Sequence, residues 1–333
     1  MWDNVSVGVV AFTDEQARTL VNLEQRYEVW MAAERALAAL PYDLRRKQVG
    51  ERFYLYEIRD RSGLGRSLGP WSDERQAQLA AYRAAKAEAK TRRDGARAAL
   101  DESGRLARAL RLPMLASAAG SILREADRRE LLGSHLLVVG TNAMAAYAVE
   151  AGGFIRGAPD ETDDFDFAWS ALAPTRNQRV LWDMLKAVDD TYTINFERTF
   201  QARNSKAYDV EVLVAPSRAA TMYRADQPRP VPLPEQEWLL LGRFVDRVVI
   251  CRDGAPARIV APDPRYFALQ KMWLGRQPKR NALKRPKDIK QGEALLAAIA
   301  QMMPQFPLDA AFEASLPAEL APFYADWRRS PPS

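Results

Sequence analysis

Apolar side chains recur at helical spacing in the first forty residues and predict a long helix. Thr13 and Gln16 form a capping-box pattern at its start, and Pro41 ends it. Residues 53–59 are rich in aromatic and β-branched side chains and predict a strand, which a glycine-rich turn joins to a short return strand. Alanine, arginine, lysine and glutamate predominate in residues 74–110 and predict a second long helix.

The middle of the chain alternates short apolar runs with amphipathic segments. This alternation predicts strands separated by helices. The predicted strands are residues 135–139, 164–169, 193–200 and 207–214, followed by a hairpin of residues 247–252 and 257–260. The predicted helices are residues 115–131, 141–149 and 177–188.

The last seventy residues are mainly helical by pattern, with one helix beginning at Asp263-Pro264 and another over residues 288–303. We therefore predict three parts: an N-terminal helical and β-hairpin unit (1–112), a core (113–262) and a C-terminal helical domain (263–333). The predicted fold class is α+β, with a mixed β-sheet flanked by helices.

Composition limits the chemistry that the chain can perform. It contains one cysteine, Cys251, and one histidine, His135, which excludes a disulfide framework, a cysteine-based zinc site and a multi-histidine metal site. His135 opens an apolar strand, and we expect it to be a satisfied core or edge residue. The chemistry must then come mainly from carboxylate, lysine, arginine, tyrosine, serine and threonine side chains. The hard oxygens of carboxylates suit Mg²⁺ or Mn²⁺.

Charge is unevenly distributed. Residues 160–166 hold five acids and no base, whereas residues 276–290 hold seven bases and one acid. Such a pair fits a metal and polyphosphate site, although two solvated faces would give the same pattern. The most apolar stretch, residues 131–154, is interrupted by polar side chains, and no signal peptide is visible. We expect a cytoplasmic protein without a membrane partner.

Asp164 and Asp166 are the strongest candidates for chemistry. Alternate side chains of a strand share a face, so both carboxylates point to one side while Phe165 and Phe167 pack on the other. Two carboxylates at this spacing can hold divalent metal ions that neutralise the phosphates of a nucleoside triphosphate (NTP). The same motif also occurs on strands without such a function.

Two further segments flank this strand in the sequence. Upstream, a buried strand ends at Gly140, and the helix that begins at Thr141 offers backbone and hydroxyl donors to a phosphate. Downstream, Asp209 and Glu211 share a face of another strand, so that either can supply a third metal ligand or accept the proton of an acceptor hydroxyl.

The three segments VVGTNAMAAYA, TDDFDFAW and YDVEVLVAP together resemble the DNA polymerase β-like nucleotidyltransferase superfamily. The chain is most similar to bacterial nucleotidyltransferases with a GTNA glycine motif and a T-x-D-h-D core, and more distantly to toxin-type transferases of the abortive-infection AbiE group. This resemblance implies that residues 113–262 form a nucleotidyltransferase core.

Site residues follow from the resemblance position by position. It implies that Gly140 and Thr141 contact phosphate and that Asp164 and Asp166 bind the catalytic Mg²⁺ or Mn²⁺. Glu211 matches the third acid best, with Asp209 as its rival. The chain departs from the family pattern in having Thr141 in place of the more usual serine or glycine, and glutamate as the third acid.

Basic residues after the core extend the resemblance. Lys271, Arg280 and Lys287 match the bases that follow the core in AbiE-like transferases, which implies that they bind the NTP triphosphate. Lys271 could instead be a surface lysine, and Asp288 a helix cap. In the N-terminal unit, aromatic residues alternate with arginines, a pattern typical of nucleic-acid binding and also of an ordinary hairpin.

The predicted function is the metal-dependent transfer of a nucleoside monophosphate from an NTP such as ATP to an acceptor. The toxin resemblance and the basic N-terminal unit favour RNA, for example a tRNA end, as this acceptor. The toxin resemblance also implies an antitoxin-like partner protein encoded in the same operon. The alternatives are nucleotidylation of a protein or a small molecule, and a catalytically silent module that binds nucleotides or nucleic acid.

Overall fold

The computed structural model describes residues 8–60, 62–159, 162, 164–174 and 177–329, so that residues 160, 161 and 163 of the acidic run lie outside it. The chain divides into a larger unit, residues 1–24 with 104–333, and a smaller unit, residues 25–103. The unit boundaries fall within helices α1 (Asp14–Ala38) and α2 (Asp73–Ala109). The division at residues 112/113 and 262/263 stays a prediction.

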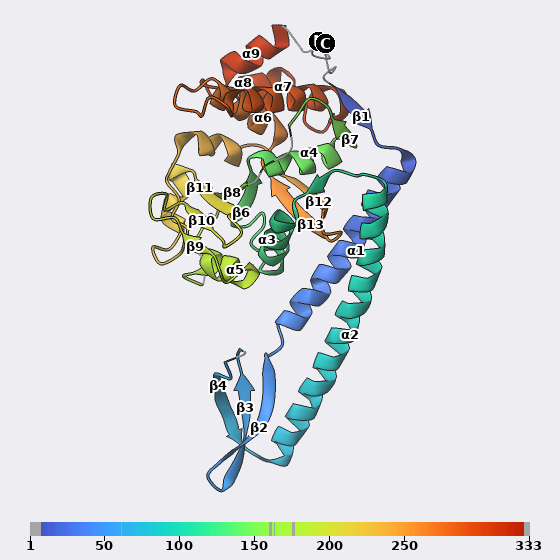
Figure 1. The fold of residues 1–333 in the computed structure, drawn as a ribbon, viewed down its shortest axis with the longest axis vertical. Coiled ribbons are helices and arrows are strands. Elements are labelled where there is room, and N and C mark those ends of the chain that lie inside the picture. The colour runs from blue at the N-terminus through green and yellow to red at the C-terminus, as the bar shows by residue number, and fades with distance from the viewer. Residues whose placement is uncertain (1–7, 61, 160–161, 163, 175–176, 330–333) are drawn as a thin grey trace. The chain divides into compact units, whose positions relative to one another are not determined.

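A five-stranded mixed sheet forms the centre of the larger unit (Figure 1), with the strand order β6-β8-β11-β10-β9. Strands β8 and β11 are parallel, and the other neighbours are antiparallel. The strands are β6 (Leu136–Val139), β8 (Asp164–Trp169), β9 (Thr193–Ile194), β10 (Gln201–Arg203) and β11 (Asp209–Val214).

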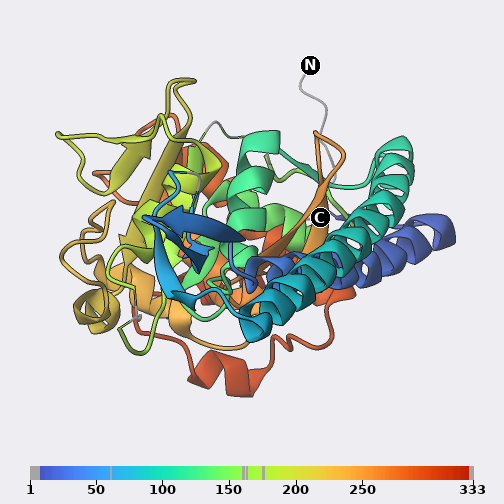
Figure 2. The same cartoon turned by 90° about the horizontal axis from the view of Figure 1, so that it is seen from below.

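Two smaller sheets complete the strands of this unit. One has the order β13-β12-β5, and its orange β12–β13 hairpin is visible in Figure 2. The other pairs β1 with β7. Their strands are β1 (Val9–Ala11), β5 (Met114–Leu115), β7 (Gly153–Ile155), β12 (Val245–Cys251) and β13 (Pro256–Ala261).

Helices pack against these sheets and enclose a continuous apolar core in the larger unit, as the α+β prediction requires. The helices are α3 (Ser117–Arg128), α4 (Met144–Glu150), α5 (Val180–Val188), α6 (Pro264–Gly275), α7 (Arg285–Met302), α8 (Ala310–Ala314) and α9 (Ala321–Arg329), with 3₁₀ turns at Thr141–Ala143, Pro216–Thr221 and Pro234–Leu240. No helix of the described residues is both long and apolar enough to span a membrane.

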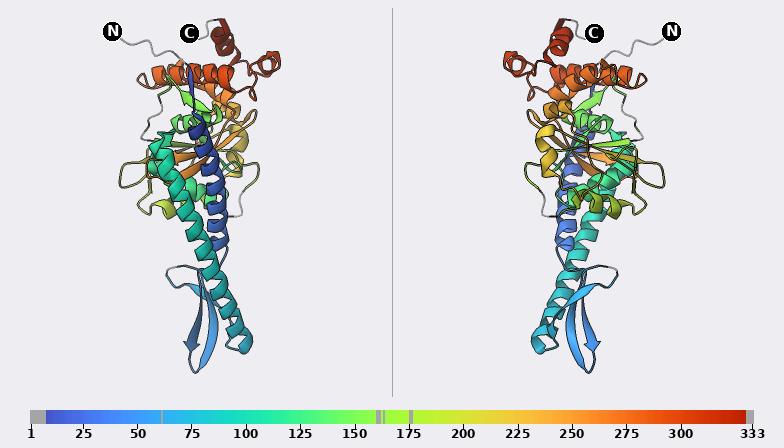
Figure 3. Two further views of the ribbon diagram at one scale, coloured as in Figure 1. Left: turned by 90° about the vertical axis from the view of Figure 1, so that its right-hand side faces the viewer. Right: turned by 90° about the vertical axis from the view of Figure 1, so that its left-hand side faces the viewer.

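The smaller unit consists of an antiparallel sheet packed on helical segments of α1 and α2. Its strands, drawn in blue in Figure 3, are β2 (Asp43–Val49), β3 (Arg52–Ile58) and β4 (Gly65–Pro70). A core of its own contains Leu44, Leu55, Leu79 and Tyr82. The predicted hairpin is therefore a three-stranded sheet, because the polar segment DLRRKQV forms a strand that hydrophobic patterning does not reveal.

Several predicted elements differ in extent, two of them for a visible reason. The strand predicted over residues 193–200 ends at Ile194, because the Asn195 side chain accepts a hydrogen bond from the Glu197 amide (3.1 Å) and turns the chain. The helix predicted over residues 115–131 begins at Ser117, because Met114 and Leu115 pair with β12.

Candidate active site

The parallel pairing of β8 with β11 brings the predicted acids together. Asp164 lies opposite Asp209 and Asp166 opposite Glu211 in the register. Phe165 is fully buried on the other face of β8, as its alternation predicts. The side chains of Asp164, Asp166 and Glu211 line one pocket of the larger unit.

Like charges dominate the electrostatics of this pocket. Burial, together with the charges of Asp164 and Glu211, raises the pKa of Asp166 to about 7. Burial and the Asp164 charge also raise the pKa of Glu211. For Asp164, burial alone would raise the pKa, but hydrogen bonds from Thr162 and the Lys284 ammonium lower it overall. Burial and mutual repulsion thus disfavour the charged forms of Asp166 and Glu211, and a cation beside them would relieve this repulsion.

The structure separates the two rivals for the third acid. Asp209 accepts two hydrogen bonds from the Arg203 guanidinium, at 2.6 and 2.7 Å, and does not line the pocket. Glu211 faces the pocket and accepts one hydrogen bond from Gln201 Nε2 at 3.0 Å. Glu211 therefore keeps acceptor capacity on the pocket side, whereas Asp209 is engaged in an ion pair.

Gly140 allows β6 to turn beside the acids. Its φ of +66° lies in the left-handed region, and a Cβ at this position would overlap the Asp166 carboxylate. The Asn142 side chain donates a hydrogen bond to the Asp164 carbonyl (2.9 Å) and fixes the turn against β8. Thr141 is buried, and its Oγ1 accepts a hydrogen bond from Gln291 Nε2 (3.3 Å). Gly140 lines the pocket of the acids, while Thr141 lines a neighbouring cavity.

Cations from α6 and from the segment before α7 form the opposite wall. Lys271 and Arg280 both line the pocket and bind the same carboxylate of Asp288, with N–O distances of 3.0 and 2.7 Å. Burial would raise the pKa of Asp288, but the Lys271 ammonium and then the Arg280 guanidinium hold it below its usual value. The interpretation of Lys271 as a surface lysine is wrong, since only 4% of it is exposed.

Lys287 and Asp288 do not lie where the sequence analysis places them, at the triphosphate and at a helix cap. Lys287 does not line the pocket; burial and the neighbouring Lys271 charge lower its pKa, while Asp164 raises it. Asp288 does not cap a helix, because α7 already begins at Arg285 and the carboxylate is turned to Lys271 and Arg280.

Several pocket residues escape sequence analysis. Lys284 Nζ lies 3.3 Å from Asp164 Oδ2 although 120 residues separate the two. Glu235, Gln236 and Gln270 also line the pocket. The density of bases in residues 276–290 signals a cationic segment, but it cannot single out Lys284.

The donor set fits a hard divalent cation. Its oxygens are carboxylates, the ligands that Mg²⁺ and Mn²⁺ prefer, and their mutual repulsion is what a cation would remove. In the described part of the chain, no three histidine, cysteine, aspartate or glutamate side chains already converge at metal-binding distance. The carboxylates of Asp164, Asp166 and Glu211 would have to rotate towards a shared ion.

Comparison with known proteins gives one match. Residues 117–317 match the family model described as Nucleotidyltransferase. This segment includes Asp164, Asp166 and Glu211, the Gly140 turn and the cationic wall. No curated protein and no solved structure matches the chain.

Proposed function

The chain belongs to the nucleotidyltransferase family, and we propose that it moves a nucleoside monophosphate from an NTP such as ATP to a hydroxyl of RNA, with Mg²⁺ or Mn²⁺ bound by Asp164, Asp166 and Glu211. The observation that carries this proposal is the pocket itself. Three electrostatically coupled acids line it together with the cations Lys271, Arg280 and Lys284.

The bound ion and Glu211 have different roles in this proposal. When bound, the divalent ion neutralises phosphate charge and lowers the pKa of the attacking hydroxyl. Glu211 is partly buried and has a raised pKa, properties that suit it to accept the proton of that hydroxyl. Asp209 stays paired with Arg203 outside the pocket.

The triphosphate would lie between the Gly140–Thr141 turn and the cationic wall. Lys271 supplies a buried positive charge that Asp288 orients, and Arg280 is partly exposed towards the ligand. Lys287 contributes at longer range, because its pKa responds to the Asp164 charge. A cation on Asp164 would displace the Lys284 ammonium, which could then bind a phosphate oxygen.

RNA as the acceptor has support in the smaller unit. Tyr54 and Tyr56 share one face of β3, and the paired positions on β2 are Lys47 and Arg45. Tyrosines that stack on bases beside cations that bind phosphates are typical of single-stranded nucleic-acid binding. A toxin-like activity on tRNA, restrained by a partner protein, is the form of this function that the AbiE resemblance suggests.

Incubation of the purified chain with Mg²⁺, each labelled NTP in turn and total cell extract tests the proposal. We expect label in RNA from one preferred NTP, and none with the double variant Asp164→Ala/Asp166→Ala. Label in protein or small molecules alone would replace the RNA acceptor. If no aspartate-dependent label and no metal-dependent NTP binding were found, the chain would be a non-catalytic binding module.

A further inference from the structure

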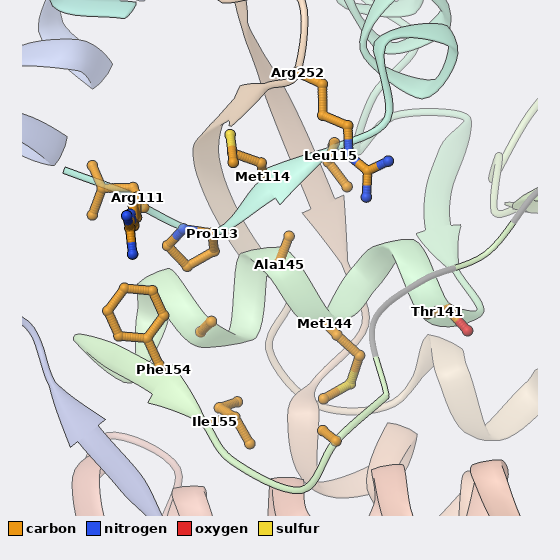
Figure 4. Close-up of a pocket in the computed structure, with 13 residues that line it drawn as sticks. Arg111, Pro113, Met114, Leu115, Thr141, Met144, Ala145, Phe154, Ile155 and Arg252 are labelled. Atoms are coloured by element: carbon orange, nitrogen blue, oxygen red, sulfur yellow. The ribbon is translucent and has the colours of Figure 1, made fainter. Parts of the chain in front are cut away.

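A second cavity of the larger unit adjoins the candidate active site. Its volume is about 280 Å³, and Thr141 lines it while the adjacent Gly140 lines the pocket of the acids. Its walls come from β5, α4 and β7, as Figure 4 shows. Most of the lining is apolar and includes Met114, Met144, Ala145, Ala148 and Phe154. Small side chains on α4 leave space for a flat apolar group.

Arginines surround the opening of this cavity. Arg111 and Arg252 line it and lie near the two ends of β5 in Figure 4. A more open hollow shares Met114 and Arg252 with the cavity and is also lined by Arg105 and Arg108. Arg105 and Arg108 are three residues apart near the end of α2 and so share one face of this helix, and Arg111 follows two residues after the helix ends.

The four arginines make the lining of the two cavities positively charged. All four arginines are exposed, and no acidic side chain of the described chain lines either cavity. Arg111 also adopts a left-handed conformation, with φ of +53°, directly after α2. Glycine is the usual residue there, so an arginine at this position carries a conformational cost.

We infer that this cavity and its arginines bind the single-stranded nucleic-acid acceptor, with one base in the cavity and successive phosphates on the arginines. An apolar slot next to an arginine track is the arrangement that single strands require. The track spans two adjoining cavities, which is more than the phosphate of one mononucleotide can contact. The assignment to the acceptor rests on the proposed function, because the link to the transfer site is the Gly140–Thr141 turn, of which Gly140 lines the pocket of the acids and Thr141 the cavity.

Binding of a fluorescein-labelled four-nucleotide RNA to the full chain, followed by anisotropy in EDTA without NTP, tests this site. The double variant Arg108→Ala/Arg111→Gly removes two charges, and glycine suits the backbone of residue 111. We expect binding to weaken about tenfold or more, and the slope of log K against log salt to become shallower by roughly 1.4.

Two further variants separate charge from shape. Ala145→Leu fills the cavity and keeps every arginine, and we expect it to weaken RNA binding while leaving the salt slope unchanged. Arg224→Ala removes an exposed arginine that lines neither cavity, and should bind RNA like the parent chain. RNA carrying 4-thiouridine should crosslink to the peptide that contains Met114 or Phe154.

The outcomes distinguish this inference from the proposed function. Unchanged binding in the arginine variant, or crosslinks only to residues 43–70, would overturn the inference. So would a free mononucleotide that binds as tightly as the RNA, or polyglutamate that competes equally well. If metal-dependent NTP binding persists in these cases, the proposed function stands; if NTP binding fails while arginine-dependent RNA binding holds, only the transferase proposal falls.

Discussion

On one wall of the pocket Asp288 lies between two cations, whereas on the other wall Asp166 lies between two further carboxylates. Lys271 and Asp288 are both almost fully buried and compensate each other, so they fix α6 against α7. The acids are compensated only in part: Lys284 lowers the pKa of Asp164, whereas burial and neighbouring carboxylates raise the pKa values of Asp166 and Glu211. The charges around Asp288 thus maintain the structure, and we propose that the acids reduce stability and serve a ligand.

The largest expected effect comes from Asp166→Asn, which removes a carboxylate and keeps its shape. We expect nucleotide transfer to fall roughly a thousandfold or more, because a misbound metal forfeits several kcal/mol of transition-state stabilisation. The free energy of unfolding without metal should stay the same or rise, because one like charge is gone. Transfer kinetics and urea unfolding measure the two effects; a destabilised variant would contradict the contrast between the walls.

Asp288→Asn tests the compensated wall. It leaves Lys271 buried without its counter-charge, and we expect a loss of about 3–5 kcal/mol in the free energy of unfolding. The double variant Lys271→Met/Asp288→Leu removes both charges and should recover most of this loss. Denaturant titration measures the free energy of unfolding of each variant. Equal values for the single and the double variant would contradict the idea that Asp288→Asn is destabilised by a buried charge without its partner.

Gly140→Ala disturbs the acids through the backbone. The new Cβ would push the Asp166 carboxylate aside, and alanine at a positive φ costs roughly 1–2 kcal/mol. We expect transfer to fall about a hundredfold, the usual consequence of a small misplacement of reacting groups. Kinetics with Gly152→Ala as the control measure this, since a Cβ at Gly152, also at positive φ, meets no atom within 4 Å.

The Asp288 carboxylate should make the stability of the protein depend on pH. The folded-state pKa of Asp288 lies below its ordinary value, so its contribution is complete above that value and is lost as the pH falls through the folded pKa. The difference in unfolding free energy between the parent chain and Asp288→Asn should therefore shrink as the pH falls from about 5 to 2. Equilibrium unfolding at several pH values tests this, and a constant difference would exclude the assignment.

The smallest effect is expected for Asp209→Asn. Its partner Arg203 is exposed, and pairs of this kind contribute little, so we expect transfer to change by less than about fivefold. Glu211→Gln is the matched variant and should lose far more. Side-by-side kinetics rank the two acids, and a larger loss for Asp209→Asn would reverse their roles.

What could be predicted from the sequence was local. Alternation over residues 164–169 places the aspartates on one face of β8, and the burial of Phe165 and Phe167 confirms it. Strand β2 was missed because most of its side chains are exposed and polar. Asn195 ends a segment whose β-branched and aromatic residues favour a strand.

The cationic wall required tertiary information. A lysine on a helix is normally exposed, and only the approach of Asp288 makes burial of Lys271 favourable. The pairing of Lys284 with Asp164 and of Arg203 with Asp209 depends on which elements become neighbours. Sequence spacing predicts which face of its own helix or strand a residue occupies. It does not identify the residue of another element that it will contact.

Because β8 and β11 are parallel, no hairpin can join them, and residues 170–208 must cross over before their acids meet. The ribosome synthesises Asp164 and Asp166 long before Glu211, and Lys271 and Arg280 follow later still. A nascent chain that ends before residue 211 carries two acids without the third and has no cationic wall. With the site that we propose, nucleotide transfer therefore has to wait until most of the polypeptide has been made and has folded.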